Sequence, residues 1–241
     1  PRGDRRAPAG RPGTPAAAAR ISRSVARPHR PPRARRERSP TPRHPPAARC
    51  ARAAAGDRET GVCLMDMVKK LDEGDVYALK KTPILPFDTA ESVFSRLSFL
   101  GAMLLYERLA DLLLGKLKKT IQSSDGVIYA HMITKEEAEL DFCLSAKEIS
   151  DKVRAFDPWP GTFGYIRGKR IKFFDSFFIK DANFKKDVVP GTIVVVGQFL
   201  GIKTSDGVVY FQSLQVEGKK LLPIKDAILG FPIACGDQIN L

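Results

Sequence analysis

Several residue types are scarce in this chain of 241 residues, and each scarcity argues against a class of protein. Four cysteines and three histidines are scattered without a Cys-x-x-Cys pair, which argues against a disulfide framework and against a zinc site. The longest apolar run, Phe99 to Tyr106, is far shorter than the ~20 residues of a membrane-spanning helix. We therefore expect no bound metal, no membrane segment and, at Cys63, Cys143 and Cys235, reduced and buried thiols.

Lysine is absent from residues 1–58, where arginine occurs sixteen times beside three acidic residues. Residues 59–241 hold 24 basic and 24 acidic side chains, so the net charge of +13 comes entirely from the first segment. A basic chain usually has a nucleic-acid or membrane partner. Here the net charge says nothing about the partner of the folded part.

Residues 1–57 also contain eleven prolines and fourteen alanines but few other apolar residues, which predicts a disordered tail. Three explanations remain open. The tail is a targeting presequence, although its prolines oppose an amphipathic helix. Alternatively it is an arginine-rich RNA-binding arm, or a stretch that is foreign to the rest of the protein.

A first folded unit is predicted at residues 58–122. Residues 61–67 and 76–85 are typical of strands. Asp88 and Glu91 have the spacing of a capping box, which predicts a helix from there to about Leu117. Its expected core-facing stripe comprises Phe94, Leu97, Leu100, Leu104 and Leu105.

Residues 123–143 are predicted to be a linker, with a break at Ser123–Gly126, an extended stretch at 127–132 and an acidic patch after it. Ser145 and Glu148 then form a second capping box. The helix that they begin is followed by two prolines, Pro158 and Pro160, that flank the only tryptophan. Since proline interrupts helices, this segment predicts a stiff hinge between a helix and a β-rich unit.

The predicted unit at residues 144–241 has five short strands, among them 163–166, 171–178, 192–197 and 208–216. Turn signals recur about every ten residues, and Arg167-Gly168 suits a tight hairpin turn. This pattern favours a small β-barrel of the oligonucleotide-binding (OB) type, although a β-sandwich of the same size stays open. A short helix is expected at residues 224–229.

Five sequence blocks, taken in order, resemble the methionyl-tRNA formyltransferases over roughly residues 55–241. The blocks are Glu59–Val62, Leu71–Asp75, Glu136–Ala138 before Asp141, Arg154–Gly161 and Ser213–Lys220. Formyltransferases that act on nucleotide sugars share the first blocks and a similar hinge. The last block favours the tRNA enzymes.

The resemblance implies an α+β chain: the truncated remnant of an α/β formyltransferase domain, then an OB-like domain that binds tRNA. In this family a formyl group passes from 10-formyltetrahydrofolate to the methionine of initiator Met-tRNA. Asp72 corresponds to the catalytic aspartate of the family's Leu-Asp-x-Gly-Asp loop. The resemblance further implies a monomer in the cytoplasm, with a mitochondrion or plastid as the alternative.

The chain departs from the family's pattern before Glu59. The family's Asn-x-His element and its Ser-Leu-Leu-Pro folate loop are not recognisable there, and no asparagine occurs before Asn183. Asp72 alone is also consistent with a turn residue. We therefore assign no folate-binding residue and predict that this chain does not transfer formyl groups; the alternative is a catalytically inactive RNA-binding module.

Basic side chains of the β-rich unit are the candidate tRNA contacts. They are Arg167, Lys169, Arg170, Lys172, Lys219 and Lys220. Cations of this kind bind phosphates, which gives affinity without sequence selectivity. Hairpin turns also carry solvated charge without any function, so the pattern predicts an interface only together with the resemblance.

Overall fold

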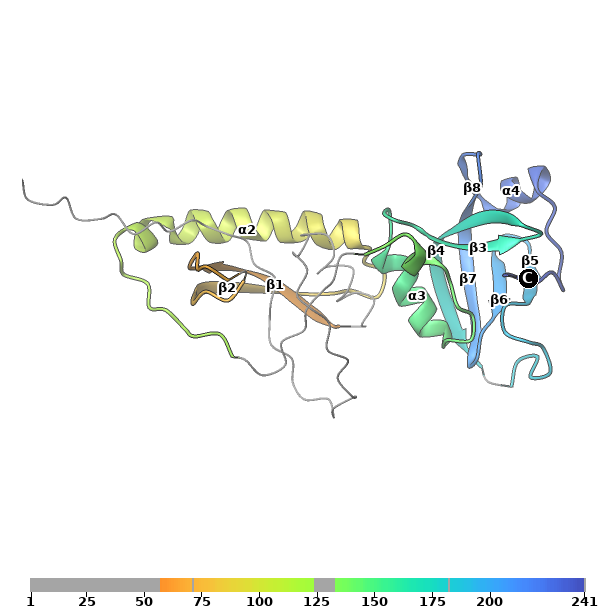
Figure 1. The fold of residues 1–241 in the computed structure, drawn as a ribbon, viewed down its shortest axis with the longest axis horizontal. Helices are drawn as coiled ribbons and strands as arrows, with labels where there is room; N and C mark the ends of the chain where they lie inside the picture. The colour runs from red at the N-terminus through yellow and green to blue at the C-terminus, as the bar shows by residue number, and fades with distance from the viewer. Residues whose placement is uncertain (1–56, 71, 124–132, 182, 241) are drawn as a thin grey trace, which may run out of the picture.

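The computed structural model describes residues 57–70, 72–123, 133–181 and 183–240. The predicted tail, apart from Asp57, and the extended stretch at 127–132 lie outside these residues. Figure 1 shows an elongated arrangement of two parts, which we call the N-terminal unit (residues 57–123) and the C-terminal unit (residues 133–240).

The N-terminal unit is a helix on a two-stranded sheet. Strand β1 (Glu59–Met65) pairs antiparallel with β2 (Val76–Pro83), and helix α2 (Ala90–Leu113) lies along the hairpin (Figure 1). Its core contains five fully buried apolar residues: Val62, Leu64, Val93, Leu97 and Leu104. This is a small core for a helix of 24 residues.

The start of α2 differs from the prediction. Thr89 is the N-cap: its hydroxyl accepts from the Ser92 N–H at 3.3 Å, and the Thr89 N–H donates to Ser92 Oγ at 3.1 Å. Asp88 instead accepts from the Leu85 N–H at 2.8 Å. The rest of the predicted stripe is confirmed, because Leu97 and Leu104 are buried and Leu100 and Leu105 are partly buried against the same core. Phe94 was predicted in the core but is exposed, and its neighbour Val93 is buried instead. The helix ends at Leu113, not near Leu117.

The second capping box is confirmed. Helix α3 (Ala146–Ala155) begins after Ser145, whose side chain accepts from the Glu148 N–H at 3.2 Å while the Glu148 carboxylate accepts from the Ser145 N–H at 3.1 Å. Ile149 and Val153 are buried, as the periodicity predicts. The residues around Trp159 then connect α3 to the first strand of the C-terminal unit, so the predicted hinge position is also confirmed.

A six-stranded antiparallel sheet forms the body of the C-terminal unit. Its strand order is β3-β4-β7-β6-β5, and β8 pairs with β7. The bounds are β3 (Thr162–Ile166), β4 (Lys169–Lys180), β5 (Ile193–Val196), β6 (Leu200–Lys203), β7 (Gly207–Val216) and β8 (Leu221–Pro223), followed by α4 (Ile224–Gly230). Arg167 and Gly168 have φ angles of 50° and 73°, as the predicted hairpin turn requires. Strands β6 and β8 were not predicted.

The edge strands β3 and β5 do not pair with each other, so the ladder is open and the closed barrel stays a prediction. A non-strand segment joins the two edges. The Ile193 N–H of β5 donates to Asp237 O at 2.8 Å. At the other edge the Asn240 N–H donates to Tyr165 O at 2.8 Å, and Asn240 Oδ1 accepts from the Tyr165 N–H at 2.8 Å.

The sheet encloses a large apolar core against α3 and α4. Phe173 and Phe211 are fully buried at its centre, with ring centroids 4.7 Å apart. Ile149 and Val153 contribute from α3, and Ile224 contributes from α4. In the part of the chain that the structure describes, no helix is both long and apolar enough to cross a bilayer.

Candidate nucleic-acid interface and catalytic aspartate

Asp72 lies in the loop that connects β1 and β2. Its φ of 57° is a left-handed conformation that aspartate adopts more readily than most residues. Gln122 fixes the loop, because its Nε2 donates to Asp72 O at 3.1 Å and to Gly74 O at 2.6 Å. A side chain at position 74 would lie 2.0 Å from Asp66 O, so the loop requires glycine there.

A polar cluster beside this loop was not predicted. Asp66 accepts from Lys119 Nζ at 2.5 Å and from the Tyr77 hydroxyl at 2.6 Å. These bonds, that from Lys119 first, hold the pKa of Asp66 below its ordinary value. The same contact with Asp66 raises the pKa of Tyr77. The cluster ties residues after α2 to the loop and so supports the position of Asp72.

The residues around Asp72 do not make a complete formyl-transfer site. Stabilising an oxyanion and moving a proton from an amine needs an amide and an imidazole beside the carboxylate. Residues 59–123 contain neither asparagine nor histidine. Among the described residues there is also no group of three potential metal ligands. The described residues around Asp72 therefore offer no imidazole for proton transfer, and the one amide beside it, that of Gln122, donates to backbone carbonyls of the loop, so we derive no catalytic step from them.

Two of the predicted basic residues converge on the segment after α4. Arg167 donates to Pro232 O, lies over the Phe231 ring at 5.0 Å and forms an ion pair with Asp237 at 3.7 Å. Lys219 Nζ donates to Gly230 O at 2.8 Å. These contacts stabilise the end of α4, so both cations have a structural partner as well as exposure to solvent.

Lys169, Arg170 and Lys220 lie at the same end of the sheet. The Glu217 N–H donates to Arg170 O at 3.0 Å, which sets the β3–β4 hairpin beside the turn that carries Lys219 and Lys220. Within the described residues the side chains of Lys169 and Lys220 are exposed and have no hydrogen bond, ion pair or ring contact. They are the cations at this end with the most freedom to bind an external anion.

Lys172 lies two residues further along the outer face of β4 from Arg170. Its Nζ donates to Pro160 O at 2.9 Å. Burial lowers the pKa of Lys172, and repulsion from Arg170 and Lys135 lowers it further. Lys135 was not predicted as part of the site, since in the sequence it is next to an acidic patch. Together these cations extend the basic surface toward the hinge.

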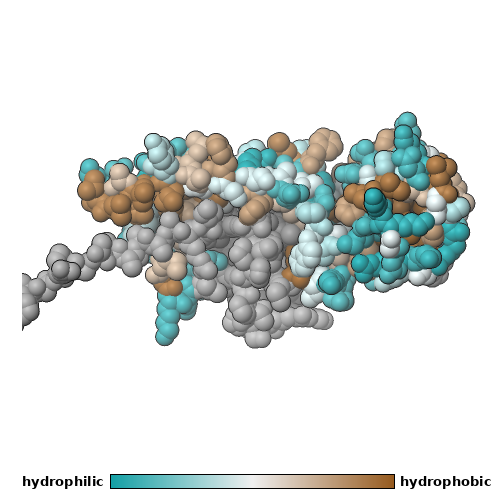
Figure 2. All heavy atoms as spheres, turned by 90° about the horizontal axis from the view of Figure 1, so that it is seen from above, coloured by the Kyte–Doolittle hydropathy of each residue, from teal (hydrophilic) through white to brown (hydrophobic). Residues whose placement is uncertain are grey.

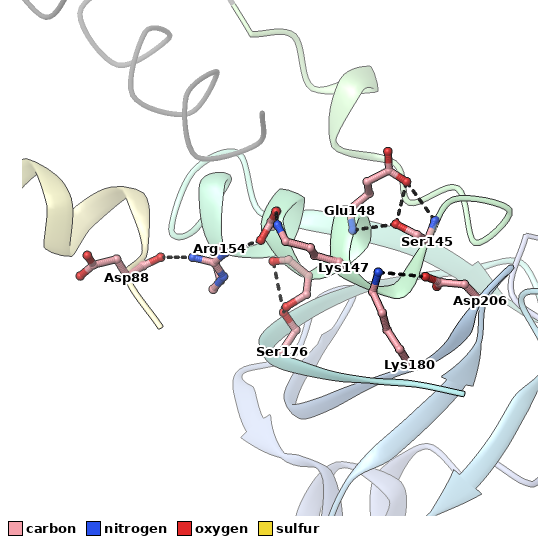
Figure 3. A network of polar contacts seen from close by, with 10 residues as sticks. Asp88, Ser145, Lys147, Glu148, Arg154, Ser176, Lys180 and Asp206 are labelled. Carbon is pink, nitrogen blue, oxygen red and sulfur yellow. Dashed lines mark hydrogen bonds and ion pairs between the residues drawn. The ribbon is translucent and has the colours of Figure 1, made fainter. Parts of the chain in front are cut away.

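A polar contact joins the two units beside this surface. Arg154 Nη1 of α3 donates to Asp88 O, just before α2, at 2.9 Å, and Figure 3 shows the guanidinium pointing toward it. The same guanidinium forms an ion pair with the buried carboxylate of Asp151, which also accepts from Lys147 Nζ at 2.5 Å. Arg154 therefore links the start of one helix to the end of another.

A small cavity of about 180 Å³ lies at this junction. Its polar lining includes Thr89, Asp157, Asp175 and Gln212. Burial raises the pKa of Asp157, and the nearby charge of Asp175 raises it further. The cavity was not predicted, because its lining residues come together only when the two units meet.

Two family matches cover most of the chain. Residues 39–109 match the family described as formyl transferase, and residues 132–232 match the formyl transferase C-terminal domain. The first match begins inside the segment that composition assigns to the tail, earlier than the expected boundary at residue 58.

Curated relatives point the same way. The chain is 36% identical over 188 residues to a methionyl-tRNA formyltransferase of Bdellovibrio bacteriovorus, covering 78% of this chain and 59% of that protein. It is 37% identical over 186 residues to the enzyme of the same name in Dictyoglomus thermophilum, covering 76% and 59%. The chain thus spans less than two thirds of the length of these relatives.

Solved structures share the fold at lower identity. HypX from Aquifex aeolicus, in complex with tetrahydrofolic acid, is 21% identical with a TM-score of 0.58, covering 81% of this chain and 36% of HypX. An N-formyltransferase from Helicobacter canadensis, in complex with folinic acid and dTDP-3-aminofucose, is 16% identical with a TM-score of 0.56, covering 68% and 59%. At these identities the likeness shows the fold alone.

Proposed function

Because the chain belongs to the formyl transferase family, we propose that its C-terminal unit is the tRNA-binding part of a methionyl-tRNA formyltransferase, with initiator Met-tRNA as its partner. The observation that carries the proposal is the basic end of the sheet, where Lys169 and Lys220 have no partner among the described residues, in a chain whose curated relatives bear that name. The segment that joins β3 to β5 also supports an OB-like barrel, a fold that binds oligonucleotides.

The binding mode follows from the side chains. Lysine and arginine at this end neutralise phosphates and release counterions, so affinity falls as salt rises. Such contacts position the RNA without selecting bases. Selection of the initiator tRNA therefore needs groups other than the six predicted basic residues of the C-terminal unit.

The test is a titration of the whole purified chain with Met-tRNA at several salt concentrations. Replacing two exposed lysines, in the double variant Lys169→Glu with Lys220→Glu, is expected to weaken binding about tenfold or more. It should also reduce the slope of log K against log salt by about 2, near one per phosphate contact. The matched control is Lys116→Glu, an exposed lysine in the N-terminal unit. Equal affinity and slope for the double variant and the control would contradict the proposal.

We propose further that this chain does not itself transfer a formyl group from 10-formyltetrahydrofolate, since Asp72 lacks an asparagine and a histidine nearby in the sequence. The measurement is formyl-methionine production from Met-tRNA and the folate donor. Product above the uncatalysed level would overturn this part, whereas tRNA binding without product supports the binding module.

A further inference from the structure

Two carboxylates line the cavity at the junction of the two units. Asp157 follows the end of α3 and Asp175 lies in β4, so the fold brings them together. Asp157 is half-buried, whereas Asp175 is exposed. Among the described residues neither side chain has a hydrogen bond or an ion pair. A half-buried carboxylate thus lies near a second negative charge, with no cation bound to it.

We propose that Asp157 makes this junction a proton-sensitive joint: the two units pack closely while Asp157 is protonated, and they move apart more readily once it is ionised. Burial takes water away from an ionised carboxylate, which costs free energy unless a partner replaces the water. Movement of the units at the cavity returns water to Asp157 and increases its distance from like charges. The ionised form therefore favours the looser arrangement.

The contact between the units is small enough for one charge to matter. It includes the hydrogen bond from Arg154 Nη1 to Asp88 O (Figure 3) and the packing of Ala90 against the apolar cluster that contains Ala155 and Phe156. The hydrophobic surface of α2 gathers toward the end that is farthest from the C-terminal unit (Figure 2). Units that share a small, partly polar interface are expected to move relative to each other.

The charged groups that face Asp157 do not neutralise it. From the start of α2, Glu91 adds a further negative charge. Arg154 of α3 also lines the cavity, but its guanidinium donates to Asp88 O and pairs with Asp151. The other lining side chains are uncharged: Phe87, Thr89, Val153, Ser176 and Gln212.

Two opposite pKa shifts separate this effect from acid unfolding. Burial raises the pKa of Asp157, and the charges of Asp175 and Glu91 raise it further. The closed arrangement is therefore most stable below the ordinary pKa of an aspartate, and it loses this stabilisation as the pH rises through the raised value. At Asp88 burial also favours the neutral form, but hydrogen bonds from Arg96 and its neighbours outweigh it and lower the pKa. Protonation of Asp88 therefore loosens the junction only at lower pH.

The test is small-angle scattering of the whole purified chain at a series of values from about pH 5 to about pH 8, above the ordinary pKa of an aspartate. In the wild type the range of distances between the units should broaden as the pH rises. In Asp157→Asn, which keeps the shape of the side chain without its charge, the range should stay narrow throughout. The matched control is Asp187→Asn, at an exposed aspartate between β4 and β5, and it should behave as the wild type does.

Asp175→Asn is a second variant that keeps the local backbone. Its φ of 54° is a conformation that asparagine also adopts. Because it removes one of the like charges, it should move the midpoint of the transition toward the ordinary pKa. The fluorescence of Trp159, the only tryptophan and 53% exposed beside Asp157, follows the same titration. Circular dichroism checks that each variant keeps its helix content.

Three results would overturn the proposal. They are a wild-type profile that is constant over this pH range, units that pack more closely at higher pH, and a transition in Asp157→Asn equal to that of the wild type. An unshifted midpoint in Asp175→Asn also counts against it. The samples contain no RNA, so failure here leaves the proposal of tRNA binding intact, and the lysine variants test that proposal separately.

Discussion

In the C-terminal unit, six strands and two helices enclose a core that includes Phe173, Phe211 and Ile224, and residues 236–240 cover the remaining gap. In the N-terminal unit, one helix covers a two-stranded hairpin and keeps several large apolar side chains exposed, among them Phe99, Tyr106 and Leu113. A two-stranded sheet alone is marginally stable in water, whereas a larger sheet packed on helices is stable by itself. The comparison teaches that the two units of one chain differ in how far they depend on outside contacts.

The strongest way to break this comparison is to remove the centre of the larger core. Phe211→Ala deletes a ring that is fully buried against Phe173, and we expect a loss of about 3–5 kcal/mol in unfolding free energy. Urea unfolding followed by near-ultraviolet circular dichroism measures it. The control is Phe199→Ala, a partly exposed aromatic, which should cost less. Equal losses for both variants would contradict the claim that the core sets the stability of this unit.

A second variant tests how the two units are joined. Arg154→Met removes the hydrogen bond to Asp88 O and the ion pair with Asp151, contacts to charged groups that are each worth about 1.5–3 kcal/mol. Asp151 keeps Lys147, so the local fold should persist. Small-angle scattering should show a broader range of distances between the units. Arg154→Lys keeps the charge but loses the paired donors of the guanidinium, so its range of distances should lie between those of the wild type and Arg154→Met. A scattering profile that is unchanged in both variants would contradict the proposed role of Arg154 in joining the units.

Closure of the sheet gives a third prediction. Asn240→Ala removes the acceptor for the Tyr165 N–H and the donor to Leu140 O, at a cost of about 1–3 kcal/mol. Asn240→Asp keeps the acceptor and loses only the donor, so its cost should be smaller. Thermal unfolding compares them. Two variants as stable as wild type would mean that the bridging segment does not hold the sheet together.

The smallest expected effect is a pH dependence in the N-terminal unit. Burial would raise the pKa of Asp88, but hydrogen bonds from Arg96, the Leu85 N–H and Ser92 outweigh it and leave the pKa below its ordinary value. Because the pKa of Asp88 is lower in the folded state than in the unfolded state, where it is near 3.9, its ionised carboxylate stabilises the fold at higher pH. This stabilisation is lost as the pH falls through the pKa of the folded state. In Asp88→Asn, the unfolding free energy measured from the helical signal of α2 should therefore fall less at acid pH than it does in the wild type. An equal fall in the variant and the wild type would contradict this.

Local signals in the sequence predicted what short-range contacts decide. Ser145 and Glu148 cap α3 as expected, because both partners lie within one turn. At α2 the two neighbouring residues Asp88 and Thr89 are both residue types that cap helices. The sequence did not show that the carboxylate of Asp88 would instead bind Arg96 and the Leu85 N–H. The sequence also did not separate Val93 from its neighbour Phe94, of which the first is buried and the second exposed.

Long-range contacts decided the rest. Clustering in the sequence identified the basic end of the sheet, but it did not separate the residues that have structural partners from those that are free. Lys219 contacts the carbonyl of Gly230 at the end of α4, Arg167 contacts that of Pro232 just after it, and Lys172 contacts Pro160 O across the hinge. The bridging role of Asn240 was likewise invisible, since its partners are 75 and 100 positions away.

The position of that bridge also governs when this protein can fold during its synthesis. β3 remains an incomplete edge until Asn240 has left the exit tunnel of the ribosome, although β3 itself emerges much earlier. The β1–β2 hairpin and α2, whose contacts are close in sequence, can associate well before that moment. A nascent chain held just short of residue 240 should therefore present an unfinished sheet edge to chaperones.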